Sequence, residues 1–286
     1  SPVDLSSKFG PVRNQDTIGW CYAYAAADMA SFKAGFRVSA MDIAVNSTSK
    51  EFPHYKRNGL SETDDQITGG YSHIALENMR DKGFCKESDS PSEYFGTDKN
   101  FKDALIAIEK KTDNQSLGHY VFNQVLPTAQ NSKCVKPDFK DLRDVALTIS
   151  QSRPQNVIYN INETRCKNKR IKIKLPKLIK NYGKRKEIID FLDKKLNSQN
   201  PLPSMISFDS AFLEEGDTIR PSAHAALIVG RRLNPLTQAC EYLIRNSYGK
   251  SCFYHPKYNY NCKDGNIWLP RETVQQYIFG ATSYEN

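Results

Sequence analysis

Residues 15–35 read QDTIGWCYAYAAADMASFKAG, and the interpretation of the rest of the chain depends on this stretch. Alanine is frequent from residue 21 onward, and no proline interrupts the run. Gly35 follows at the position where a left-handed residue commonly ends a helix. The stretch therefore predicts a helix over 21–34, with Cys21 in its first turn.

A cysteine in the first turn of a helix is a candidate nucleophile. The helix N-terminus carries partial positive charge and free N–H groups, both of which favour a thiolate. Gln15 lies six residues upstream, and its side-chain amide can donate a hydrogen bond to an oxyanion. On this stretch alone, however, a lone cysteine ahead of a helix is more often a buried structural residue.

Two distant stretches change that balance. SAHAALIVG at 222–230 places His224 at the start of an apolar strand, and YLIRNSYG at 242–249 places Asn246 at the end of the next one. A turn-like segment joins the two strands, so His224 and Asn246 can lie side by side. Taken singly, His224 reads as a strand-edge residue and Asn246 as a turn residue. A nucleophile, an imidazole and a polar group that orients it form a catalytic triad, which the order Gln-Cys-His-Asn fits.

Four blocks of the chain resemble the papain-like cysteine peptidases, the papain and cathepsin group. In chain order they are PVRNQDTIGWCYAYAAADM at 11–29, GGYSHIALENMRDKG at 69–83, SAHAALIVG at 222–230 and YLIRNSYGKS at 242–251. The chain departs from the family at Ile18 and Ile67, where a disulfide usually lies, and at Tyr248, where the family usually has tryptophan. The two isoleucines can replace the bridge by an apolar contact, and Tyr248 keeps an aromatic ring over the Asn246–His224 pair.

The resemblance implies an α+β fold with a helical lobe, a β-rich lobe and an active-site cleft between them. Helical periodicity dominates the first third of the chain and strand-length apolar runs the last third, in agreement with this class. We expect one catalytic unit over 1–286. Its parts are a helical lobe over about 9–96, an inserted helical and basic segment over about 97–185, and a β-rich lobe over about 186–286.

The resemblance also assigns catalytic roles. Cys21 would be the nucleophile, His224 its imidazolium partner and the acid that protonates the leaving amine, and Asn246 the residue that orients His224. Gln15 and the backbone N–H of Cys21 would form the oxyanion hole. Substrate-binding candidates lie at the paired glycines, just after them, and on the strands of the other lobe: Gly69, Gly70, Tyr71, Ser72, Met205, Ala225 and Tyr248. Glycine suits close approach of a substrate backbone because it has no Cβ.

The chain contains seven cysteines: Cys21, Cys85, Cys134, Cys166, Cys240, Cys252 and Cys262. An odd number fits three disulfides and one free thiol, which we expect to be Cys21. Cys252–Cys262 is the expected short bridge, and the other pairings stay open. This content favours a secreted, periplasmic or lysosomal protein over a cytosolic one with buried thiols. No CxxC or HxxxH spacing occurs, so we expect no metal and no cofactor.

The net charge of +8 comes from one segment, RCKNKRIKIKLPKLIKNYGKRK at 165–186, which holds 11 Lys/Arg and no acid. Such a segment could bind nucleic acid, an anionic membrane or an acidic substrate. Its single aromatic residue offers no stacking platform, which argues against nucleic acid. Apolar residues alternate with lysines at Ile171, Ile173 and Leu175, so we expect a half-buried, solvated edge strand.

The function expected from these observations is hydrolysis of peptide bonds by a monomeric endopeptidase, because no His-His loop follows the glycines to grip a substrate terminus. Its partners would be peptide or protein substrates, and a pro-segment or a protein inhibitor could occupy the cleft of a zymogen. No run approaches the roughly 18–20 apolar residues of a membrane span. Two alternatives stay open: a non-catalytic homologue that holds peptides, and a cysteine amidase or transferase that acts on non-protein amide bonds.

Overall fold

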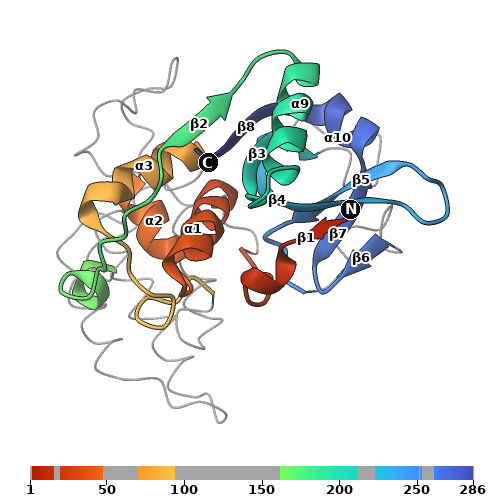
Figure 1. Ribbon diagram of the computed structural model, residues 1–286. Helices are drawn as coiled ribbons and strands as arrows, with labels where there is room; N and C mark the ends of the chain where they lie inside the picture. Colours follow the sequence, from red (N-terminus) through yellow and green to blue (C-terminus); the bar gives the residue numbers. More distant parts are fainter. Residues whose placement is uncertain are drawn as a thin grey trace, which may run out of the picture.

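The computed structural model describes residues 2–15, 20–47, 70–93, 162–210, 223–250, 252 and 261–285. Figure 1 shows helices α1, α2 and α3 grouped on one side, with an antiparallel sheet and helices α9 and α10 on the other. Two stretches of the inserted segment whose apolar spacing predicts helices, FKDALIAIEKK at 101–111 and PDFKDLRDVALTISQS at 137–152, lie outside the described residues, as do Ile18, Ile67, Gly69 and Cys134.

The helical side is built around α1 (Cys21–Ala34), which packs against α2 (Ala40–Ser47) and α3 (Ser72–Lys82). Helix α1 ends at Gly35 with φ of 72°, the left-handed conformation predicted for that glycine. The run YSHIALENMRDK at 71–82, followed by Gly83, predicts a second helix, and α3 confirms it. Helix α2 was not predicted; it is only eight residues long, and all of them are buried.

Eight antiparallel strands form the sheet, in the order β2-β8-β3-β4-β5-β7-β6, with β1 paired to β4. Their bounds are β1 Val3–Asp4, β2 Leu178–Asn181, β3 Ser204–Asp209, β4 Ala223–Leu233, β5 Cys240–Arg245, β6 Cys262–Lys263, β7 Asn266–Pro270 and β8 Ile278–Tyr284. A short 3-10 helix covers Ser6–Lys8, α9 covers Arg185–Leu196 and α10 covers Arg271–Tyr277.

Strand β4 is buried on both faces, which explains its unbroken apolar run. Ala225, Leu227 and Val229 belong to the core shared with α1, whereas Ala226 and Ile228 belong to the core beneath α9. Successive side chains of a strand point to opposite faces, so β4 separates the two cores. Helix α1 packs directly on β3 and β4. The N-terminal helices are therefore fixed against the strand that carries His224.

The strand predicted around Ile171–Leu175 is wrong in position. Ile171 makes only an isolated bridge with Phe84, and the ladder begins at Leu178, where β2 pairs with β8. Pro176 lies between these two places and has no N–H to donate to a ladder. Residues 178–181, which the sequence placed in the inserted segment, are therefore part of the main sheet.

The structure contains two disulfides among its described residues, one short-range and one long-range. Cys252–Cys262 is the bridge predicted from sequence, and Cys85–Cys166, with a Cα–Cα distance of 5.6 Å, joins residues 81 apart. The sequence does not determine the second bridge, because six cysteines allow many pairings. Two disulfides indicate an oxidising environment.

The Cys85–Cys166 bridge lies beside a buried polar cluster centred on Asp42 of α2. The Asp42 carboxylate accepts hydrogen bonds from the backbone N–H of Cys85 (3.0 Å), from Asn162 Nδ2 (2.7 Å) and from Arg170 Nη2 (2.8 Å). A buried carboxylate needs such partners, because an unpaired charge away from water costs several kcal/mol, by order of magnitude. The cluster thus anchors residues 162–170 to α2.

Candidate active site

Cys21 is the first residue of α1 and is half-buried. Burial raises the pKa of its thiol, while hydrogen bonds from the backbone N–H groups of Ala225, Tyr22 and Cys21 itself act in the opposite direction. The contact with Ala225 shows that the sulfur faces the start of β4. Packing of α1 on β4 therefore brings the predicted nucleophile to the residue that follows His224.

His224 is buried at the start of β4, and its Nε2 atom lies 2.7 Å from Oδ1 of Asn246. An amide oxygen only accepts, so Nε2 carries the proton in this pair and Nδ1 is the atom that can take a proton from a thiol. The ring is enclosed by Phe208, edge-on at 5.4 Å between centroids, and by Tyr248 at 5.1 Å. Burial lowers the pKa of His224 to about 4, although the hydrogen bond to Asn246 partly offsets it.

Asn246 follows β5 and is held in one orientation. Its Oδ1 also accepts a hydrogen bond from the backbone N–H of Ser247, at 2.8 Å. Its Nδ2 is buried and has no hydrogen-bond partner among the described residues. With the oxygen fixed between two donors, the side chain presents an acceptor to His224.

Gln15 lies against the same loop. Its backbone N–H donates to the carbonyl of Ser247 (2.8 Å), and its Oε1 accepts a hydrogen bond from the Ser247 hydroxyl. Asn14 and Tyr248 form an antiparallel bridge beside this pair. Because the Gln15 oxygen is turned toward Ser247, Nε2 is the end of the amide that can donate to an oxyanion.

A buried ionic network joins the segments that carry three of these residues, Gln15, Cys21 and Asn246. Asp28 of α1 accepts from Arg13 Nε at 2.9 Å and from Arg245 Nε at 2.7 Å. Arg13 also pairs with Glu87 at 2.6 Å, and Arg245 donates to the carbonyl of Pro11 at 2.8 Å. Burial alone would raise the pKa of Asp28, but Arg245 and Arg13 outweigh it and keep that pKa below its usual value.

Sequence reasoning missed this network, although a signal existed. Arg13 stands two residues before Gln15, and Arg245 stands directly before Asn246. Charged residues inside otherwise apolar blocks are seldom fully buried unless they are paired. The acid that pairs with both, Asp28, lies on the same helix as Cys21.

The predicted substrate-binding residues fall into two groups. Gly70 packs against the ring of Tyr22, and a Cβ placed on it would lie 2.7 Å from that ring, so glycine is required there. Next to it, Tyr71 is 54% exposed. On the sheet side, Met205 and Ala225 are only 2% and 6% exposed, so each offers little surface to a ligand.

Ser72 and Tyr248 complete the predicted set. Ser72 opens α3, and its hydroxyl is buried without a hydrogen-bond partner among the described residues. Tyr248 lies against the ring of His224, at the place predicted for the aromatic cover. The structure therefore puts Tyr248 in the same cluster as His224 and Asn246.

An aromatic group that the sequence did not identify lies next to Gly70. The hydroxyl of Tyr182 is 2.6 Å from His73 Nδ1, and the rings of His73 and Tyr71 lie 5.9 Å apart. Burial, together with the nearby Lys180, lowers the pKa of His73 to about 4. Tyr182 is 45% exposed and reaches this place from the segment before α9. Only the fold brings it close, since it lies more than 100 residues from His73 in the chain.

Across the described ranges, no group of three or more His, Cys, Asp or Glu side chains is placed to hold a metal ion. Among the helices that the structure describes, none is long and apolar enough to cross a membrane.

Comparison with known proteins finds matches among solved structures, but none among family models or curated sequences. No protein-family model and no curated protein sequence matches the chain. Among solved structures, the chain is similar to xylellain, a cysteine protease from Xylella fastidiosa, with a TM-score of 0.52, 16% identity, and coverage of 100% of this chain and 85% of that one.

Two further structures are similar over nearly the same extent. Digestive procathepsin L2 proteinase from the Tenebrio molitor larval midgut gives a TM-score of 0.51 and 15% identity, over 99% of this chain and 67% of that one. The ragweed pollen allergen Amb a 11, a cysteine protease in its proform, gives 0.52 and 14%, over 100% and 65%. The chain therefore has the two-lobed α+β fold of the papain-like cysteine proteases.

Proposed function

We propose that this protein is a cysteine endopeptidase that cleaves peptide bonds through a covalent thioester. The observation that carries the proposal is the arrangement around β4. Cys21, at the N-terminus of α1, faces the backbone of Ala225, and the preceding residue, His224, is held at 2.7 Å by Asn246. A nucleophile, a base and an orienting group from three separate segments are thus gathered at one place.

The first half of the reaction would use the proton of the Cys21 thiol. His224 Nδ1 takes this proton, and the thiolate attacks the carbonyl carbon of the scissile peptide bond. The negative oxygen that results is stabilised by Gln15 Nε2 and by the backbone N–H of Cys21. Burial disfavours a thiolate on Cys21 alone and an imidazolium on His224 alone. Transfer of the proton from Cys21 to His224 forms both charges together, so that each stabilises the other.

The second half would return that proton. The imidazolium of His224 protonates the leaving amine, which departs and leaves a thioester on Cys21. Water, deprotonated by the neutral His224, then attacks the thioester carbonyl; the C–S bond breaks, the acid is released, and the departing Cys21 sulfur takes the proton back from His224. Asn246 keeps the ring oriented throughout, because its oxygen accepts from Nε2 in both protonation states.

The substrate would be an extended peptide whose backbone lies along Gly70. The exposed rings of Tyr71 and Tyr182 beside it favour an apolar or aromatic side chain near the cut. A pro-segment or a protein inhibitor would bind in the same place. The two disulfides suit a secreted, periplasmic or lysosomal location.

An epoxide inhibitor of thiol peptidases tests the proposal. We expect one adduct per molecule, on Cys21, after brief exposure at mildly acidic pH. Cys240 serves as an internal control, because its thiol is free and more exposed than that of Cys21. Peptide mapping by mass spectrometry identifies the site, and a peptide library measures cleavage.

The outcomes separate the three functions. Labelling of Cys21 together with cleavage of peptides supports the endopeptidase. Labelling without cleavage would point to an amidase or transferase instead. Equal labelling of Cys21 and Cys240 would mean that the site does not activate its thiol, as in a non-catalytic homologue.

The pH dependence of kcat/KM should have its acid limb near pH 4. Catalysis requires unprotonated His224, whose pKa is lowered from 6.5 to about 4, so activity is retained above that value and lost as the pH falls through it. In Asn246→Ala the limb should move to lower pH, because that variant loses the hydrogen bond that raises the pKa of His224. Initial rates with a fluorogenic peptide give both profiles. A limb near 6.5 in the parent protein would contradict the burial of His224.

A further inference from the structure

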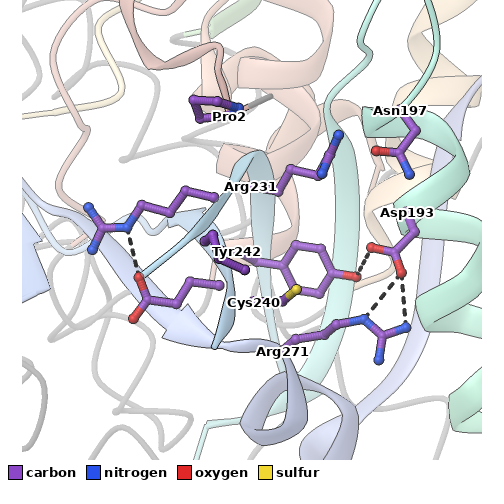
Figure 2. A pocket seen from close by; sticks show the side chains of 10 residues that line it. Pro2, Asp193, Asn197, Arg231, Cys240, Tyr242 and Arg271 are labelled. Carbon is purple, nitrogen blue, oxygen red and sulfur yellow. Dashed lines mark hydrogen bonds and ion pairs between the residues drawn. The ribbon is translucent and has the colours of Figure 1, made fainter. Parts of the chain in front are cut away.

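A cavity of about 500 Å³ lies on the α9 face of the sheet, away from the candidate active site (Figure 2). Its lining includes Asp193, Asn197, Arg231, Cys240, Tyr242 and Arg271. None of the predicted catalytic residues belongs to it. Arg231 lies seven residues beyond His224 along β4, which is about 23 Å in an extended strand.

Strand register places the key side chains on one face. Arg231 is paired with Tyr242, and Leu233 with Cys240, across the β4–β5 ladder. Residues that are two apart on a strand share a face, so Arg231 and Cys240 are diagonal neighbours on one face of the sheet. Both side chains line the same cavity. Figure 2 shows Arg231 between Pro2 and Asn197, with the sulfur of Cys240 in front of the Tyr242 ring.

The other charges around the cavity neutralise one another. Asp193 pairs with Arg271 at 2.9 Å and accepts from the Tyr242 hydroxyl at 2.6 Å. Arg232 pairs with Glu241 at 2.7 Å. These contacts leave no acid of the cavity wall to balance Arg231.

Arg231 has no hydrogen bond or ion pair with any residue that the structure describes, and its Nε atom is buried. A guanidinium donor that is withdrawn from water without a partner is unfavourable, and a bound anion would remove that cost. A carboxylate matches the planar guanidinium with two parallel hydrogen bonds. The cavity thus has one uncompensated positive charge and enough volume for a small organic acid.

Cys240 adds a reactive group to this wall. Its thiol is free and exposed, whereas four other cysteines of the chain are joined in disulfides. A free exposed thiol in a disulfide-forming environment is open to exchange with a disulfide from outside. The thiol and the unpaired cation belong to the same cavity, so one ligand can engage both.

We propose that this cavity takes a small acidic disulfide, whose carboxylate pairs with Arg231 and whose sulfur exchanges with Cys240. In the exchange, the Cys240 thiolate attacks one sulfur of the incoming disulfide, a new S–S bond forms, and the original S–S bond breaks. The departing thiolate takes a proton from water. No further oxidant is needed, because the incoming disulfide is reduced to one free thiol as Cys240 is oxidised.

A second copy of the chain is the competing partner for Cys240. A symmetric Cys240–Cys240 bridge would bring two Arg231 side chains together, and like charges at close range repel. The charge of the cavity therefore favours a small acid over a second protein chain.

The test uses the full-length Cys21→Ala protein and two disulfides of similar size and opposite charge, dithiodipropionate and cystamine. Rates of labelling at Cys240 are followed by peptide mapping under non-reducing conditions. We expect the anionic disulfide to react about tenfold faster than the cationic one, which is the preference that one partly screened ion pair supports. Adipate, which lacks sulfur, should slow the anionic reaction by competing for Arg231.

Three variants identify the cause of the preference. Arg231→Gln should abolish it, and Arg231→Lys should retain most of it. Lys263→Gln removes the same charge from an exposed position on β6 outside the cavity and should leave it unchanged. Melting temperatures confirm that each variant is folded.

The proposal would be overturned by equal rates for the two disulfides, by a preference that persists in Arg231→Gln, or by a Cys240-linked dimer as the main product. Equal loss of the preference in Lys263→Gln would also overturn it, because the effect would then come from net charge alone.

Discussion

Asp28→Asn is expected to lower the free energy of unfolding by about 3–5 kcal/mol, the usual cost of breaking a buried ion pair by removing one partner. Asp28 compensates two guanidinium groups, those of Arg13 and Arg245, whose side chains are almost fully buried. Asparagine keeps the shape of the side chain but not its charge. Among the described residues, Arg245 would then have no carboxylate to balance its charge, and its other partners are the carbonyl of Pro11 and the ring of Phe9.

Urea unfolding, followed by tryptophan fluorescence, measures this loss. Asp190→Asn is the matched control, since Asp190 pairs with Lys186 on the surface of α9 with side chains that are 52% and 78% exposed. An exposed pair of this kind contributes about 0–1 kcal/mol. Similar losses in the two variants would show that the Asp28 network is no more important to stability than a surface pair.

Cys21→Ala and His224→Ala are each expected to reduce kcat/KM by a factor of about 10⁴ or more, and the double variant should be no worse than either single one. The reason is that the two side chains act on one proton. Once the thiol is gone, His224 has nothing to deprotonate, and without His224 the buried thiol stays protonated because burial raises its pKa.

Initial rates on a fluorogenic peptide, at one pH and with active-site concentrations checked, provide the comparison. Melting temperatures near that of the parent protein show that the loss is chemical. If the two single effects multiply in the double variant, Cys21 and His224 act separately, and the base for Cys21 has to be sought elsewhere.

The parts of the fold that the sequence predicted well are those with strong local signals. Helix α1 has an alanine-rich run and a glycine that adopts the required left-handed conformation. Strand β4 has an apolar run that is buried on both faces. In both elements the local preference and the tertiary environment agree, which makes the pattern readable.

Elements without such a signal were missed or misplaced. Helix α2 is only eight residues long and is buried all round, so it lacks the exposed polar face that marks a longer amphipathic helix. Strand β2 occupies 178–181 in place of 170–175, because the alternation of lysine and isoleucine resembles a strand before Pro176, where the described residues offer only the isolated bridge of Ile171 with Phe84. Pairing with β8, nearly 100 residues away, decides the true position.

The sequence could predict which residues form the candidate site, but not which contacts hold them in place. Cys21, His224, Asn246 and Gln15 follow from motifs and from the family resemblance. The contact of Ser247 with Gln15 and the pairing of Arg245 with Asp28 span more than 200 residues. Such contacts depend on how α1 lies against the sheet, which no local pattern determines.

The disulfide and the hydrogen bonds that hold residues 162–170 beside α2 have a consequence for how this chain could change in evolution. Ser90 donates a hydrogen bond to Asn162 at 2.9 Å, and the Cys85–Cys166 bridge closes the chain just outside that contact. The two ends of the segment between Ser90 and Asn162 are therefore held next to each other. A segment whose ends are held at one place can change in length without changing the distance that its ends must span, and closing a longer loop adds little entropy cost. Changes of length between residues 94 and 161 are therefore expected to leave the contact of Ser90 with Asn162 in place, and with it the attachment of residues 162–170 to α2.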